Sequence, residues 1–413
     1  MNQNIIKRQI TKFGFYGFFK NLRFFDPVLL IYLYSFGLSA FHIGLLYAIR
    51  ETIIYIFEIP SGVFADRYGK KTELIICFVF YILSFAVFAI GTVFWVFVIA
   101  MILFGLGEAF RSGTHKAMIM QYMDEKNLKD EKSKIYGKTR SYSMIGSMIS
   151  SLFTIYLVIA IPELKFLFFL AIIPYLIDIV LILTYPKFLN DRKETSFNFK
   201  SFMIENKKTI TYVWKDKEMR SILFRSSSYA AIFKILKDFI QLILVTIPIT
   251  WLLFSQYTAD EHVEIYSAIM YAFIFLVSAI TSRYAYKLLK YKNHEQLNRL
   301  MWLFSGMASL VIGLFVNQLF VIFIGFVLLY VFLNVRKPIM VEVIGDHADP
   351  ERRASVLSID SQLTSLFIIV FAPLIGLLAD NVSYSFMFIV VGVLMIISYI
   401  VFLFNEIAIK RGN

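Results

Sequence analysis

The chain has 413 residues, of which 59% are hydrophobic and 17% are charged, and its mean hydropathy is +0.70. Because soluble domains average about 45–50% apolar and about 25% charged residues, this composition excludes an ordinary soluble domain. The formal net charge is +12, but the basic residues lie between apolar segments, as they do in cytoplasmic loops. We therefore expect a lipid bilayer, and no nucleic acid, as a partner. The single cysteine, Cys77, lies in an apolar run without a nearby base, so we interpret it as a packing residue.

Twelve apolar segments follow one another along the chain, and a bilayer crossing needs about 20 such residues. Six precede a polar stretch, at residues 13–40, 43–65, 72–91, 94–122, 135–159 and 166–185. Six follow it, at residues 221–254, 262–286, 298–316, 319–343, 354–379 and 384–406. The pattern predicts an all-α membrane protein with twelve transmembrane helices in two pseudo-symmetric six-helix bundles. The predicted domains are an N-terminal bundle (1–185), a linker (186–220) and a C-terminal bundle (221–413).

The basic residues indicate which side of the membrane each loop faces. The linker is rich in Lys and Arg, which marks it as cytoplasmic. Loops on the linker's side repeatedly carry basic residues, whereas the loops assigned to the other side carry one, Lys165. We therefore predict a monomeric multi-pass protein of the plasma (inner) membrane with both termini in the cytoplasm.

The two halves of the chain resemble each other at an offset of roughly 214 to 225 residues. The matching positions are Phe19–Arg23 with Phe233–Lys237, Arg67-Tyr68 with Arg283-Tyr284, and Arg111 with Arg336. These matches fall in the same order and on corresponding predicted helices. Two similar halves of this kind are a transporter architecture, in which the substrate site lies near the middle of the membrane between the repeats.

A charged motif follows the second predicted helix. Its residues are Gly62, Asp66, Arg67, Gly69, Lys70 and Lys71. The motif resembles the signature loop between helices two and three of the major facilitator superfamily: a glycine, three residues, Asp-Arg, any residue, a glycine and two basic residues. The second half has a degraded copy with Arg283 and Lys287 but no matching aspartate. The resemblance implies twelve helices and a conformational latch formed by these six residues on the cytoplasmic side.

The chemistry of the motif is consistent with this role. Gly62 would allow another helix to approach closely, and Gly69 would permit a tight turn. Asp66 lies near a helix C-terminus, where the helix dipole disfavours a negative charge. We therefore expect Asp66 to have a partner, either Arg67 or Lys70 or the N-terminus of another helix.

Charged residues within the predicted helices are the candidates for binding and coupling. A charge at the bilayer centre costs roughly 2.5–3.5 kcal/mol, so such residues are functional candidates, although some only pair and hold helices together. The resemblance implies that helices one, four, seven and ten line a central cavity, and most of these charges lie on those helices. The substrate-binding candidates are Arg23, Arg111, His115, Lys237 and Arg336. The proton-coupling candidates are Asp26, Glu108, Asp238, Glu342 and Asp360. Glu108 and Arg111 are also spaced to pair on one helix face.

Three functions remain open from the sequence. The first is a secondary active transporter that moves a small solute by alternating access, coupled to protons, with export as one direction to test. The second is an anion exchanger or importer that uses the cavity arginines and lysines, because arginine offers a fork to carboxylate or phosphate. The third is a receptor or scaffold that does not transport. The sequence shows no nucleophile cluster, metal-ligand set or nucleotide loop, so we expect no enzyme activity, no metal and no cofactor.

Overall fold

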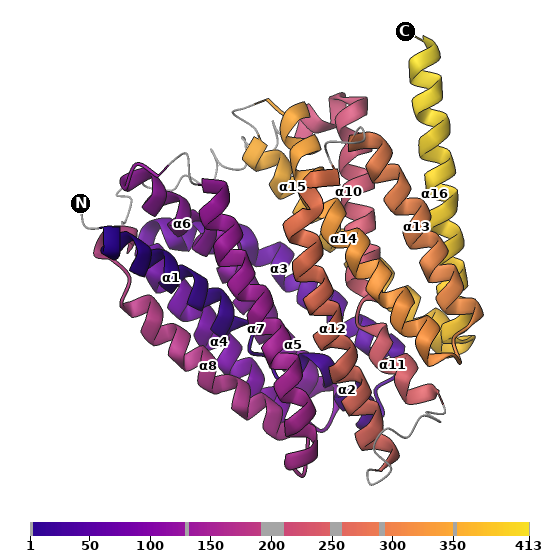
Figure 1. Cartoon of the computed structure of the whole chain (residues 1–413), viewed down its shortest axis with the longest axis horizontal. Coiled ribbons are helices and arrows are strands. Elements are labelled where there is room, and N and C mark those ends of the chain that lie inside the picture. Colours follow the sequence, from indigo (N-terminus) through magenta and orange to yellow (C-terminus); the bar gives the residue numbers. More distant parts are fainter. Residues whose placement is uncertain are drawn as a thin grey trace. The chain divides into compact units, whose positions relative to one another are not determined.

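The computed structural model describes residues 3–128, 132–190, 210–247, 258–288, 294–349 and 353–412. Within these ranges the regular structure is entirely helical, and ten helices are long and apolar enough to cross a membrane. The chain divides into two compact units, which are described separately below (Figure 1). The predicted domain boundaries at residues 185 and 221 stay a prediction, and most of the linker, residues 191–209, lies outside the described residues.

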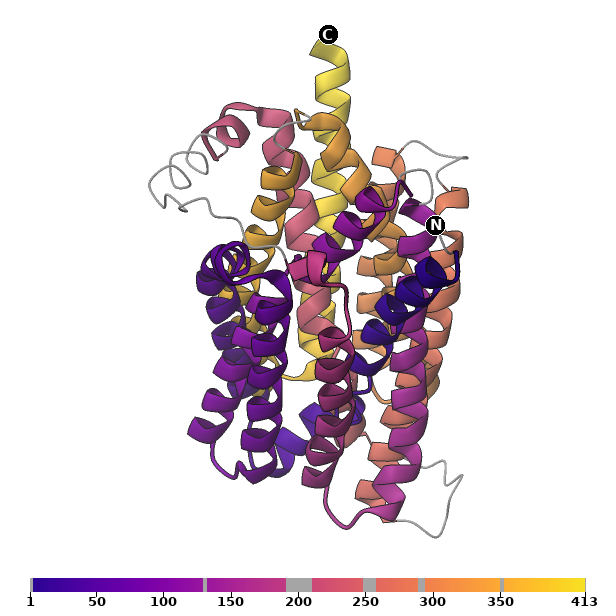
Figure 2. The same cartoon turned by 90° about the vertical axis from the view of Figure 1, so that its left-hand side faces the viewer.

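Unit 1 comprises residues 1–38, 46–197 and 256–279. Its helices are α1 (Gln3–Lys20), α2 (Leu29–Ser35), most of α3 (Ala40–Tyr68), α4 (Lys70–Ile90), α5 (Phe94–Arg111), α6 (Thr114–Glu125), α7 (Lys132–Ala160), α8 (Lys165–Leu183) and most of α12 (Ala259–Leu288). Helix α4 packs against α5 and α8, and α1 packs against α7 and α8. In Figure 2 the helices coloured indigo to magenta can be followed along their length. Large aromatic rings fill the interior, as where Phe25 stacks on Phe168 with 4.5 Å between ring centroids.

Unit 2 comprises residues 39–45, 198–255 and 280–413. Its helices are α10 (Lys217–Leu236), α11 (Phe239–Thr246), α13 (His294–Leu314), α14 (Leu319–His347), α15 (Arg353–Asn381), α16 (Tyr384–Gly412) and the start of α3. Helix α13 packs against α14 and α16, and α10 packs against α14 and α15. The backbone N–H groups of Ala40 and Phe41 donate to the Asp380 carboxylate at 3.0 and 2.7 Å, so that this acid caps the first turn of α3.

Apolar side chains also cover much of the outer surface. Trp95 is 72% exposed and Ile90 is 68% exposed. Exposed large apolar side chains recur along the long helices, and extensive apolar surface marks a surface that meets an apolar environment. The exposed aliphatic and aromatic residues on the long helices are therefore the surface that we expect to face lipid.

Three of the predicted spans are interrupted, which corrects their expected continuity. The first span stops at Lys20 and resumes with a 3-10 turn at Asp26–Val28 and then α2. The fourth stops at Arg111 and resumes at Thr114, and the seventh stops at Leu236 and resumes at Phe239. The tenth span, in contrast, is the single helix α14. The interruptions therefore place candidate residues of the first, fourth and seventh spans at helix ends.

Hydroxyl groups from other helices satisfy the backbone carbonyls that the first interruption exposes. Tyr175 donates to the Lys20 carbonyl at 2.9 Å, and Thr154 donates to the Phe24 carbonyl at 2.7 Å. Ser267 of α12 donates to the Pro27 carbonyl. Because a bilayer core has no water to bind free carbonyls, these donors let the helix break exist at membrane depth.

Candidate functional site

The signature loop is a tight turn between α3 and α4. Gly69 adopts a φ of 95°, a backbone conformation that side chains disfavour. A Cβ atom at this position would also lie 2.3 Å from the Asn190 Oδ1 atom. The same Oδ1 atom accepts a hydrogen bond from the Lys71 backbone N–H at 2.9 Å. The turn therefore requires glycine for two reasons, its conformation and its contact with Asn190.

The two lysines of the motif hold the ends of neighbouring helices. The Lys70 ammonium donates to the Gln121 side-chain oxygen at 2.7 Å, and the Lys71 ammonium donates to the Leu183 and Tyr185 carbonyls at 3.0 and 2.9 Å. A cation is favourable at such helix C-termini because of the helix dipole. These contacts fasten the turn to the ends of α6 and α8.

The other motif residues lie on the last turns of α3. Asp66 is half-buried, and the Arg67 guanidinium carbon lies 5.4 Å from the centre of the Tyr68 ring. The close helix approach expected at Gly62 is absent from the described part of the chain, since a Cβ atom there would meet nothing within 4 Å. The latch role of the six motif residues stays a prediction.

A charged cluster connects the first span with α5 inside unit 1. The Glu108 carboxylate pairs with Arg23 at 3.2 Å and also with Arg111. Tyr81 donates to the same carboxylate at 2.6 Å, and the Arg23 Nε atom donates to the Tyr175 hydroxyl at 2.6 Å. Two predicted substrate ligands and one predicted proton carrier thus meet in a single hydrogen-bonded group.

The cluster is enclosed, which makes its charge balance important. The side chains of Arg23 and Glu108 are 13% and 19% exposed, and Arg111 is more open at 30%. The Arg23 guanidinium also lies 5.0 Å from the centre of the Phe104 ring, within range of a cation–π interaction. Breaking one partner of a buried ion pair is costly because it leaves the other charge uncompensated. In this structure Glu108 acts as the common counter-ion of two arginines.

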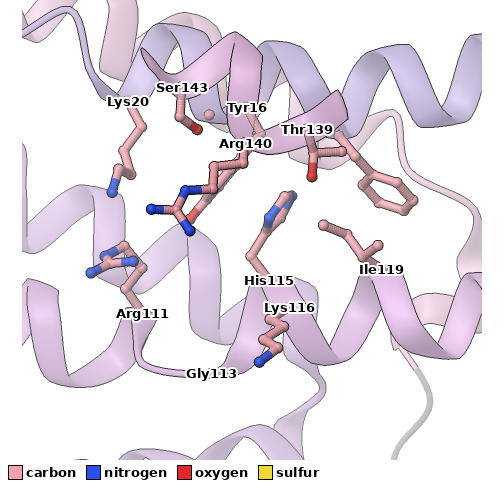
Figure 3. Close-up of a pocket in the computed structure, with 12 residues that line it drawn as sticks. Tyr16, Lys20, Arg111, Gly113, His115, Lys116, Ile119, Thr139, Arg140 and Ser143 are labelled. Atoms are coloured by element: carbon pink, nitrogen blue, oxygen red, sulfur yellow. The ribbon is translucent and has the colours of Figure 1, made fainter. Parts of the chain in front are cut away.

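A pocket of about 200 Å³ adjoins this cluster between α1, α6 and α7. Four cationic side chains line it: Lys20, Arg111, Lys116 and Arg140. His115, Thr139 and Ser143 add polar groups, and no carboxylate is among the lining residues. Figure 3 shows Lys20, Arg111 and Arg140 gathered at one end of the pocket, with His115 near its centre.

The break in the fourth span builds one wall of the pocket. Gly113 adopts a φ of 75° at the N-cap of α6, so the chain turns sharply after Arg111. This turn directs the N-terminus of α6 to the pocket, and helix N-termini attract anions through their free N–H groups and dipole. His115 is fixed within this wall: it stacks on Tyr16 with 3.6 Å between ring centroids, and its Nε2 atom lies 3.2 Å from the Tyr185 hydroxyl.

The remaining candidates lie elsewhere. In unit 2, Arg336 is 2% exposed; it donates to Asn298 at 2.7 Å and to the Arg225 and Ser226 carbonyls at 2.6 and 3.4 Å. Lys237 pairs with Asp238 at 2.8 Å at the break between α10 and α11. The other three candidates are Asp26, in the 3-10 turn of unit 1, Asp360 on α15, and Glu342 on α14, whose side chain lies outside the described part of the structure.

Sequence reasoning missed several residues of the pocket and cluster. Lys20 and Arg140 line the pocket, and Tyr81 and Tyr175 bind the charged cluster. A signal for Lys20 was present, because it belongs to the repeated segment at Phe19–Arg23. Arg140 and the tyrosines carry no local motif, since only the packing of α7, α4 and α8 brings them to the site.

Comparison with known proteins identifies the family. The model of the Major Facilitator Superfamily matches residues 13–335 and 295–412. The uncharacterized MFS-type transporter YxaM of Bacillus subtilis (strain 168) is 34% identical over 126 residues, which are 30% of this chain and 32% of that protein. The chain thus matches about a third of that relative's length.

Solved structures show the same fold over nearly the whole chain. A POT family transporter in complex with 5-aminolevulinic acid has a TM-score of 0.79 at 14% identity, covering 96% of this chain and 95% of that one. A mutant of the nucleoside transporter NupG has a TM-score of 0.78 at 13% identity, covering 96% and 99%. These likenesses confirm the predicted fold class, and the family match confirms a multi-pass membrane protein of a family of transporters rather than enzymes. The chain belongs to the major facilitator superfamily, a family of secondary transporters.

Proposed function

We propose that this protein transports a small solute with a carboxylate or phosphate group, by alternating access. The observation that carries the proposal is the pocket lined by four cationic side chains and no carboxylate. Two of the cations are arginines, Arg111 and Arg140, whose planar forks suit carboxylate and phosphate oxygens. The N-terminus of α6 adds backbone N–H groups, whose partial positive charge also favours an anion.

The size of the pocket limits what part of the solute it would hold. Its volume is about 200 Å³, which is below the roughly 300–1,000 Å³ of pockets that enclose a whole drug-sized ligand. The pocket therefore suits a small anion or the acidic group of a larger solute. An anion in the pocket would be attracted by all four of these positively charged side chains.

Glu108 supplies a means of exchange. It pairs with Arg111 in the described structure, and Arg111 also lines the pocket. An incoming anion would compete with Glu108 for this guanidinium while Arg23 stays paired with Glu108. On this proposal Glu108 holds Arg111 in place until the solute arrives, rather than acting as the first proton carrier.

Proton-coupled exchange is the second candidate, and Asp360 favours it. Its Oδ1 atom is buried without a hydrogen-bond partner among the described residues, and its carboxylate lies within electrostatic reach of Arg336 and Lys234. Asp26, Asp238 and Glu342 remain proposed proton carriers, and Arg23, His115, Lys237 and Arg336 remain proposed substrate ligands. The cytoplasmic termini, the plasma membrane location, the monomeric state and the direction of transport also remain proposals.

The pocket can be tested by ligand-dependent stability of the purified protein. Sulfate, inorganic phosphate and succinate should raise its unfolding temperature at constant ionic strength, whereas glucose and choline should not. Arg140→Gln should remove the anion effect. Lys138→Gln is the matched control, because Lys138 is exposed on the same helix and does not line the pocket. The proposal would be contradicted if the anions stabilised both variants equally. It would also be contradicted if none of the three anions stabilised the wild-type protein.

A further inference from the structure

An acid outside the predicted set lies buried beside the basic pocket. Asp178 is on α8 and is 0% exposed. Among the described residues, neither of its carboxylate oxygens has a hydrogen-bond partner, and the same holds for the hydroxyl of Tyr16. Buried polar groups are nearly always satisfied, so each exception calls for an explanation, and a functional role is one.

Lys20 connects this acid with the pocket. Asp178 lies beside the Lys20 backbone N–H without a hydrogen bond of ordinary geometry, and the Lys20 charge acts on its carboxylate. Tyr175, one turn earlier on α8, donates to the Lys20 carbonyl at 2.9 Å and so fixes α8 against the end of α1. The Lys20 side chain lines the pocket (Figure 3). The backbone of Lys20 thus lies beside a buried acid, while its side chain lines the space that an anion would occupy.

The other groups around Asp178 come from the helices that pack against α8. Tyr16 of α1 and Tyr185, just beyond α8, lie within electrostatic reach of the carboxylate. The Tyr185 hydroxyl lies 3.2 Å from the His115 Nε2 atom in the pocket wall. On α4 the titratable residues are Lys70, Lys71, Glu73, Cys77 and Tyr81. Of these, Lys71 binds carbonyls, Glu73 accepts from Thr114, and Tyr81 donates to Glu108.

We propose that Asp178 is a proton-binding site coupled through Lys20 to the basic pocket, so that anion and proton bind together. This inference rests on the proposed anionic solute. An anion in the pocket draws the Lys20 charge to itself and offsets its field at Asp178. A buried carboxylate that loses the support of a cation favours its neutral, protonated form. The Tyr185 and His115 side chains provide a polar route between the pocket and this part of α8.

The proposal sets the sign of the coupling. Because linkage is reciprocal, protonation of Asp178 must strengthen anion binding by the same factor by which the anion strengthens proton binding. Anion and proton would therefore cross in the same direction, as in a symporter. Couplings of this kind are typically about 5- to 150-fold, so we expect anion binding to be at least roughly fivefold stronger at acidic than at alkaline pH.

Sulfate is the probe, because it carries no proton of its own near neutral pH. The experiment measures sulfate binding to the purified full chain by calorimetry, and proton uptake in weakly buffered solution with a pH indicator. The wild type should take up protons when sulfate binds. The Asp178→Asn variant should bind sulfate at every pH as tightly as the wild type does at acidic pH, because the amide imitates the protonated acid. For the same reason, this variant should take up no protons when sulfate binds.

Two further variants and an infrared spectrum test whether Asp178, rather than another group, binds the proton. His115→Gln alters the pocket wall and should lower sulfate affinity, but sulfate binding should still be accompanied by proton uptake; if this variant abolishes proton uptake while Asp178→Asn retains it, His115 is the proton site and our assignment is wrong. Glu73→Gln, which alters another fully buried acid of the same unit, should leave proton uptake unchanged. If Asp178→Asn fails to fold, infrared difference spectra of the wild type should still show a protonated carboxylic acid on sulfate addition. Sulfate binding without proton uptake overturns the coupling alone, whereas no anion binding overturns the proposed function.

Discussion

Arg111 and Arg336 occupy matching positions in the two halves of the chain, yet their surroundings differ. Arg111 ends a helix, pairs with Glu108, and lines a pocket. Arg336 lies within the continuous helix α14, where Asn298 and two backbone carbonyls surround it. Its guanidinium carbon also lies 4.2 Å from the centre of the Tyr229 ring. Arg111 is hydrogen-bonded to a carboxylate, which on our proposal a ligand replaces, whereas the hydrogen bonds of Arg336 go to neutral acceptors and Asp360 lies only within electrostatic reach.

The difference suggests that a repeated cation can serve binding in one half and structure in the other. Carbonyl and amide dipoles stabilise a buried guanidinium without offering a charge to exchange, whereas a carboxylate can be exchanged for a ligand anion. The substrate role predicted for Arg336 therefore stays a proposal, and the following experiments test whether the two arginines divide their roles in this way.

The largest expected effect is on stability when Arg336 is replaced. Arg336→Met leaves Asn298 and the Arg225 and Ser226 carbonyls without their donor, and each buried unsatisfied group costs roughly 1–3 kcal/mol. We expect a loss of several kcal/mol, measured by denaturant unfolding in detergent. Lys337→Gln, at an exposed neighbouring position, should change stability little. A stable Arg336→Met protein with weakened anion binding would reverse the assigned roles.

Glu108→Gln separates the counter-ion role from proton transfer. The amide cannot balance Arg23 and Arg111, so both guanidinium charges become available to an anion. We expect sulfate to bind about tenfold more tightly, which is roughly 1.4 kcal/mol, while transport in proteoliposomes slows at least tenfold because the solute is not released. Unchanged sulfate affinity in a folded Glu108→Gln protein would show that Arg111 does not exchange its partner.

Arg111→Lys tests the geometry of the site at constant charge. Lysine keeps the positive charge but lacks the planar fork, so a bidentate contact with the ligand is lost. We expect anion affinity to fall roughly tenfold with little change in unfolding temperature. The measurement is calorimetric titration with inorganic phosphate, and an equal loss for the matching Arg336→Lys variant would argue against the contrast between the two units.

Gly113→Ala should give the smallest effect. Gly113 has a φ of 75°, and an L-residue in this conformation costs roughly 1–2 kcal/mol. We expect unfolding to become easier by about 1 kcal/mol, with anion binding weakened because the N-terminus of α6 shifts. Gly137→Ala is the control, because Gly137 lies within α7 and a Cβ atom there would meet nothing within 4 Å; it should be neutral or slightly stabilising.

Sequence patterns predicted the family and most helices because apolar length and the motif at Gly62–Lys71 are local properties. They did not predict the helix breaks at residues 21–25, 112–113 and 237–238, because each break is short and lies within a longer segment that is mostly apolar. The Glu108–Arg111 contact was foreseeable from its spacing, and the structure places these residues together. The pocket was not foreseeable, because Lys20 and Arg140 are far apart in sequence and only the packing of α1 on α7 joins them.

The position of α12 has a consequence for dividing the gene. Unit 1 includes residues 256–279, which lie beyond the linker, and Ser267 within them binds the Pro27 carbonyl of the first span. A fragment that ended at the linker would therefore lack a helix of its own compact unit. Cutting this gene at the linker would therefore divide the contacts of unit 1 between two polypeptides.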